Sequence, residues 1–173
     1  FLVNFEIYQG KSTPVINPEY DRVFGMVTAP IISFLDELPD DKKSYPYHIV
    51  TDNLLTSLNL LKHLRERGYS GTGTIRKNRI SKDCILPSHE QMKKMKRGTF
   101  RAAIEKRDGI FIGKWIDNSV VAVASNSLGE NSVKSVKRFS TKEKKHINIL
   151  QPAVIGTYNK NMGDTNRMDQ DIN

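Results

Sequence analysis

The order of the expected elements predicts an α/β protein. A short strand over residues 47–52 is followed directly by an amphipathic helix over 53–67 and by a second strand over 71–76. A strand, a helix and a strand in this order form a right-handed crossover unit with a parallel strand pair. A second signal is the predicted β-hairpin over residues 109–125, which supplies two antiparallel strands further along the chain.

The N-terminal residues are expected to form a strand and a helix. Residues 1–8 alternate between apolar and polar side chains, as in a strand with one apolar face. Between residues 20 and 38 the apolar side chains follow helical spacing. Pro30 lies inside that pattern, so we expect a kink or a break there.

Asp52 ends the first strand of the crossover unit. In open α/β sheets, functional sites collect at the carboxyl ends of the strands, so Asp52 is a candidate site residue. An alternative is that Asp52 caps the helix predicted from Asn53, which is a common use of aspartate. Gly68 is a natural stop for that helix, and two glycines loosen the strand that follows it.

The segment after residue 76 has a different character. Residues 90–107 form a basic, helix-like run, and the hairpin follows with Asp117 and Asn118 in its turn. Trp115 of this hairpin is expected in the core rather than as a base-stacking surface. A Ser- and Lys-rich stretch covers residues 132–145, and the tail can be helical from about Met162.

The positive charge of the chain is unevenly distributed. The chain carries 27 Lys and Arg against 19 Asp and Glu, a net charge of +8. Residues 76–107 alone hold eleven basic and three acidic residues, and a second basic cluster lies between residues 134 and 145. Clustered positive charge is typical of a protein that binds a polyanion. The alternative is a basic face that is merely exposed to solvent.

Composition also excludes some classes of protein and site. One cysteine excludes an internal disulfide and a cysteine-based metal cluster, and the four histidines lack zinc-ligand spacing. No run approaches the roughly 20 apolar residues of a membrane span, and the first residues lack the pattern of a secretory signal. We therefore expect a soluble intracellular protein with no membrane partner.

Several motifs resemble those of one transposase family. Residues 49–57 (IVTDNLLTS) and 71–79 (GTGTIRKNR) resemble the segments around the second catalytic aspartate of piggyBac transposases. Residues 113–118 (GKWIDN) are similar to the Lys-Trp-x-Asp hairpin of that family, and residues 136–138 to the basic segment after it. Residues 158–170 (YNKNMGDTNRMDQ) resemble its final motif. These blocks follow the order of the family along nearly the whole chain.

The resemblance implies an RNase H-like catalytic fold, a class of α/β sheet, with an inserted α+β subdomain. The family's first catalytic aspartate and its strand would lie upstream of residue 1, so this fold is expected to be incomplete, with the first strand missing. The expected divisions are residues 1–76 for the first part of the catalytic domain, 77–151 for the insertion and 152–173 for the C-terminal helical part.

The resemblance also identifies the residues of a DDE site. Such a site holds two divalent ions with several converging carboxylates, and Mg²⁺ is the ion expected in the ancestral enzyme. Asp52 matches the second acid and is the expected metal ligand. Aligned on Asp169 and Gln170, the third acid falls on Asn166, whose amide lacks the charge of a strong ligand.

Asp169 is not expected to replace the missing third acid. It lies about 4.5 Å further than Asn166 along a helix axis, whereas functional sites need placement to about 0.5 Å. We therefore expect a degenerate D-D-N site that retains no metal, in a chain inactive by itself.

The expected function is that of a domesticated, transposase-derived DNA-binding protein in the nucleus. The expected DNA contacts, which the resemblance and the charge clusters indicate together, are Arg76, Lys77, Arg79, Lys137 and Arg138. The DNA would be transposon-end-like or non-specific, and a homodimer would form through regions outside this chain. Two alternatives stay open: part of an active cut-and-paste transposase, and a protein-interaction module without DNA binding.

Overall fold

The structure of the protein is a computed structural model that describes residues 17–129 and 132–171, with side chains described as far as residue 163. The strand expected over residues 1–8 lies outside the described residues. The chain divides into two compact units, residues 1–47 and 48–173, which are described separately below. None of the described helices is long and apolar enough to cross a membrane.

The first unit contains three helices, α1 (Pro18–Phe24), α2 (Ala29–Asp36) and α3 (Asp40–Lys43). The helical pattern expected over residues 20–38 is broken, as one of the two expected outcomes, but the break does not lie at Pro30. The chain breaks at Gly25, which adopts a φ of 84° that ends α1. Pro30 lies in the first turn of α2, where its missing N–H costs no helical hydrogen bond.

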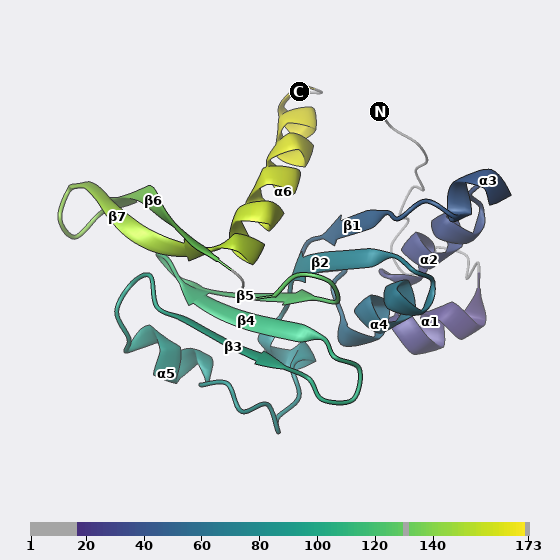
Figure 1. The fold of residues 1–173 in the computed structure, drawn as a ribbon, viewed down its shortest axis with the longest axis horizontal. Coiled ribbons are helices and arrows are strands. Elements are labelled where there is room, and N and C mark those ends of the chain that lie inside the picture. Colours follow the sequence, from purple (N-terminus) through teal and green to yellow (C-terminus); the bar gives the residue numbers. More distant parts are fainter. Residues whose placement is uncertain (1–16, 130–131, 172–173) are drawn as a thin grey trace. The chain divides into compact units, whose positions relative to one another are not determined.

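The second unit is built on a five-stranded sheet in the order β1-β2-β5-β4-β3 (Figure 1). Its strands are β1 (His48–Thr51), β2 (Ser70–Thr74), β3 (Phe100–Ile104), β4 (Phe111–Ile116) and β5 (Val120–Ser125). The pair β1–β2 is parallel and the other pairs are antiparallel, which confirms the crossover unit and the hairpin. Because β5 pairs with β2, the sheet continues into the segment expected as an insertion, residues 77–151. The predicted domain boundaries stay a prediction.

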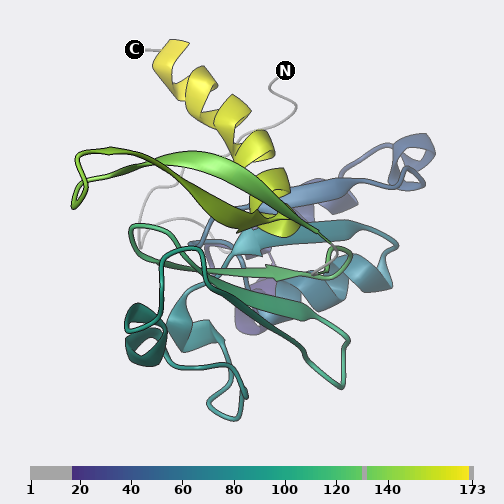
Figure 2. The same ribbon diagram turned by 60° about the vertical axis from the view of Figure 1, so that its left-hand side comes forward.

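Each face of the sheet carries its own apolar cluster. One face packs against helix α4 (Leu58–Glu66) and the segment 80–86, around Leu61 and Ile112. The other packs against a two-stranded ribbon, β6 (Val133–Ser140) and β7 (Lys145–Pro152), and helix α6 (Ala153–Asp171) (Figure 2). Trp115 is buried in this second cluster, which confirms its expected place in the core.

Three expected elements differ from the structure. The basic run 90–107 is not one helix: α5 spans His89–Lys93, and residues 100–104 form β3, where Phe100 packs beside Phe111. Gly98, at a φ of 88°, separates the helix from the strand. The Ser- and Lys-rich stretch forms β6 and its turn, and α6 begins at Ala153 rather than near Met162, directly after β7.

Candidate functional site

Asp52 lies directly after β1, at the carboxyl end of the parallel strands. Its Oδ1 accepts hydrogen bonds from the backbone N–H groups of Leu54, at 3.0 Å, and Leu55, at 3.2 Å. These bonds fix an Asx turn. Helix α4 begins later, at Leu58, with Ser57 as its N-cap. The expected helix is therefore confirmed, but it begins at Leu58 rather than at Asn53. Its capping by Asp52 is wrong, because Asp52 stabilises the turn before the helix.

Two threonines, Thr51 and Thr56, support this turn through hydrogen bonds. Thr56 is fully buried, and its hydroxyl donates to the backbone oxygen of Asp52 at 2.6 Å. The same hydroxyl lies 2.7 Å from the Thr51 hydroxyl. Gly73 of β2 leaves room for them, since a Cβ there would lie 2.1 Å from Thr56 Oγ1 and 2.5 Å from the Thr51 carbonyl oxygen. Sequence reasoning missed this support, although a glycine inside a strand is the usual signal of close approach.

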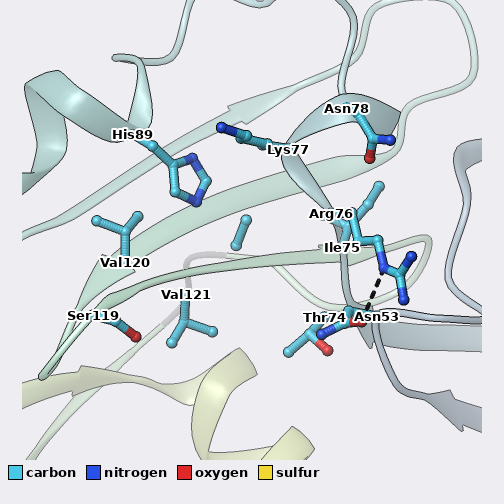
Figure 3. A pocket seen from close by; sticks show the side chains of 11 residues that line it. Asn53, Thr74, Ile75, Arg76, Lys77, Asn78, His89, Ser119, Val120 and Val121 are labelled. Carbon is cyan, nitrogen blue, oxygen red and sulfur yellow. Dashed lines mark hydrogen bonds between the residues drawn. The ribbon is translucent and has the colours of Figure 1, made fainter.

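Two of the residues expected to contact DNA are bonded to the same loop. Arg76 Nε donates to Asn53 Oδ1 at 3.1 Å (Figure 3), and Arg79 Nη1 donates to the Thr56 carbonyl at 2.6 Å. Lys77 lies between them in a 3-10 turn and is exposed. The structure therefore brings this basic segment, residues 76–79, onto the loop that carries Asp52. Arg79 is half-buried and has a structural role there.

A pocket of about 620 Å³ adjoins this segment. Strand residues, including Val120 and Val121, form one wall, and Lys77 and His89 lie on another side (Figure 3). Burial, and then the charges of Lys114, Lys77 and Lys93, lower the pKa of His89. Arg76 and Lys77 line the pocket, and no carboxylate is among its described lining residues, so the pocket favours an anionic ligand over a cation.

Helix α6 connects the predicted third position to this end of the sheet. It packs against β1 and β2, and the Tyr158 hydroxyl lies 3.2 Å from the hydroxyl of Thr74, the last residue of β2. The helix continues to Asp171, so Asn166 and Asp169 lie on one continuous helix. Their side chains are not among those that the structure describes. Their three-residue separation corresponds to a rise of about 4.5 Å.

The described side chains do not by themselves make a metal site. Through residue 163, leaving out the undescribed segments, no group of three His, Cys, Asp or Glu lies close enough together to hold an ion. Asp52 supplies one carboxylate, and two backbone N–H groups already occupy its Oδ1. Mg²⁺ needs near-octahedral oxygen ligands, so Asp52 would need partners from elsewhere.

The remaining predicted contacts, Lys137 and Arg138, lie on β6 and face opposite sides of the ribbon. Lys137 is exposed. Arg138 Nε lies 3.4 Å from Asp117 Oδ2, and Arg97 Nε donates to Oδ1 of the same carboxylate at 3.0 Å. Asp117 therefore binds two arginines, and Arg138 contributes to holding the ribbon on the hairpin turn.

The comparisons with known proteins agree with this architecture. A protein-family model described as Transposase IS4 matches residues 1–173. The chain is 36% identical over 172 residues to the human PiggyBac transposable element-derived protein 2 and 37% identical over 172 residues to the human PiggyBac transposable element-derived protein 3. Each alignment covers 99% of this chain and 28% of the relative, so the chain spans little more than a quarter of their length.

A solved structure shows the same fold. This chain is similar to a chain in the cryo-EM structure of a piggyBac transposase synaptic complex with hairpin DNA, with a TM-score of 0.55 and 19% identity. The match covers 94% of this chain and 29% of the transposase chain. This likeness shows the fold alone. The family model and the two human relatives, which match the chain from end to end, show that it belongs to the piggyBac transposase family.

Proposed function

We propose that this chain is a transposase-derived DNA-binding segment, acting in the nucleus, whose D-D-N metal site no longer supports transposition. The observation that carries the proposal is the Asp52 loop. It holds one acid at the carboxyl end of β1 and is bonded to the basic residues Arg76 and Arg79. The structural neighbour is a complex with hairpin DNA, which supports DNA as the polyanion.

Positive charge at this end of the sheet supports DNA binding. Arg76 and Lys77 are exposed, and both line the pocket whose electrostatics favour an anion. Phosphate contacts release condensed counterions, and this release supplies most of the affinity for non-specific DNA. Arg79 contributes by holding the loop that both residues adjoin.

The acidic residues of the site do not favour catalysis. The family relation implies a divalent metal in the ancestral enzyme. Here Asn166 stands at the third position of the matching motif, and a neutral amide is a poorer ligand for a hard cation than a carboxylate. The third acid of the matching motif is therefore replaced, and metal-held charge is the main source of transition-state stabilisation in such sites.

Charge reversal at Arg76 and Lys77 together is expected to weaken binding to any duplex about equally, because phosphate contacts carry little sequence information. Two lost contacts should reduce the slope of log affinity against log salt by about two units. Fluorescence anisotropy of the natural polypeptide on two unrelated duplexes, over a range of salt concentrations, measures this change. Arg79 is left intact, since its bond to Thr56 stabilises the loop.

The control variant is Lys106→Glu, which reverses one charge at a site away from this segment. Lys106 is exposed in the turn between β3 and β4, and this turn lies toward the opposite end of the sheet, where Phe111 pairs with Ser125. Its reversal should leave the salt slope within experimental error. An unchanged slope in the Arg76/Lys77 variant would instead favour a protein-interaction module that does not bind DNA through this segment.

A further inference from the structure

The β6–β7 ribbon has one buried and one open face. On the buried face, Val136, Ile147 and Ile149 pack against the cluster that contains Trp115. Trp115 Nε1 donates to the Leu150 carbonyl at 2.8 Å, and Arg97 Nη1 donates to the Phe139 carbonyl at 3.0 Å. Contacts along its length therefore fix the ribbon on the sheet.

The open face combines apolar and polar side chains in register. Every outward position from Val133 to Leu150 is exposed: Val133, Ser135, Lys137, Phe139, His146, Asn148 and Leu150. The cross-strand pairs are Ser135 with Leu150, Lys137 with Asn148, and Phe139 with His146, whose rings meet edge to face at 5.5 Å. Phe139 is 49% exposed and Leu150 is 55% exposed. Exposed apolar side chains gathered on one surface mark an interaction site.

The charge of the ribbon selects the kind of partner. The ribbon carries five lysines: Lys137 lies on the open face, and the others are Lys134, Lys142, Lys144 and Lys145. Glu143 is the acidic residue of β6, β7 and their turn, and it pairs with Lys145 at 3.2 Å. Within the described ranges no carboxylate forms an ion pair with Lys137, Lys142 or Lys144. A surface of this charge is complementary to a polyanion.

The dimensions of the ribbon fit duplex DNA. Each strand has eight residues and, at about 3.3 Å per residue, is about 26 Å long. Paired strands lie about 4.8 Å apart, and a major groove about 12 Å wide admits a two-stranded ribbon. Asparagine can bond the N6 and N7 edge of adenine, lysine can bond guanine O6 and N7, and apolar side chains contact the thymine methyl group.

We propose that the open face of the ribbon binds the major groove of duplex DNA, with Lys137 and Asn148 at the base edges and the tip lysines at the phosphates. This inference rests on the proposed DNA-binding function and adds to it the recognition of a base sequence by the ribbon. Figure 1 shows the ribbon extending from the sheet, with its turn at the far end. Lys137 and Asn148 pair near the middle of the ribbon, where the face can enter a groove.

The test is a dimethyl sulfate footprint on duplexes selected from a random pool by the natural polypeptide. The reagent reports guanine N7 in the major groove and adenine N3 in the minor groove. We expect protection at guanine N7, and its loss in the Lys137→Ala/Asn148→Ala variant. Preference for the selected duplex over a scrambled one should fall by about ten-fold or more in that variant. Both side chains are exposed, so thermal unfolding should be unchanged.

A matched double variant is Lys106→Ala/Asn118→Ala, which makes the same chemical changes at exposed positions outside the ribbon. It should keep the footprint. Unchanged guanine N7 protection and preference in the ribbon variant would overturn the groove assignment, whether DNA is then held by Arg76 and Lys77 alone or the ribbon face binds a protein. Failure of the natural polypeptide to bind any duplex would overturn the proposed function itself.

Discussion

Gly73→Ala is expected to lower the free energy of unfolding by about 3 kcal/mol and to displace the Asp52 turn. The added Cβ would lie 2.1 Å from Thr56 Oγ1 and 2.5 Å from the backbone oxygen of Thr51. A flexible side chain could move away, but the Thr51 oxygen belongs to β1, which pairs with β2 at this position. Relief therefore requires the two parallel strands to separate or the turn to shift. Urea-induced unfolding followed by circular dichroism measures the loss.

Gly156→Ala is the control for this substitution. Gly156 lies in α6, and a Cβ there would meet only Gln151 Oε1, at an ordinary 3.6 Å. Alanine favours the helix over glycine by roughly 1 kcal/mol, so this variant should be as stable as the natural protein or more so. Equal stability of the two variants would contradict the close packing of Gly73 against the threonines.

Asn126→Leu is expected to cost about 3 kcal/mol, because it removes three buried hydrogen bonds to backbone groups. Asn126 follows β5, and its side chain accepts from the Gly71 N–H at 2.7 Å. Its amide donates to the carbonyl oxygens of Leu61, at 2.9 Å, and Tyr69, at 3.0 Å. One buried amide thus joins α4, β2 and the end of β5.

Hydrogen exchange should show where this loss occurs. The Gly71 amide should exchange faster in the Asn126→Leu variant, together with amides of the neighbouring part of β2. Asn148→Ala, at an exposed strand position, should change stability by less than about 0.5 kcal/mol. A leucine variant as stable as that control would show that the Asn126 bonds contribute little.

The elements that could be predicted are those with local signals. The crossover unit followed from a strand and an amphipathic helix adjacent in sequence, and the hairpin followed from alternation around Asp117. The strand pattern over residues 47–52 placed Asp52 at a strand end, and in the structure it lies directly after β1. The RNase H-like description and the D-D-N site stay predictions.

The elements that could not be predicted depend on distant partners. The lysine-rich β6 has few apolar residues, and its place on the sheet depends on Ile149 and Trp115, which are remote from it in sequence. The pairing of Arg138 with Asp117 could not be predicted, because Asp117 lies on another hairpin and nothing local indicates the pair. The contact of Arg138 with DNA stays a prediction. The Asp52 turn looked like a helix start because aspartate favours both structures.

The proposed loss of strand cutting is tested most directly by a nicking assay on hairpin and duplex DNA with Mg²⁺ or Mn²⁺. The natural polypeptide, the Asp52→Ala variant and the Asn166→Asp variant are compared at concentrations where anisotropy shows the DNA fully bound. Our account predicts that the natural polypeptide binds and gives no more nicked product than Asp52→Ala. Metal-dependent nicking by the natural polypeptide that Asp52→Ala abolishes would contradict it and show an active transposase site.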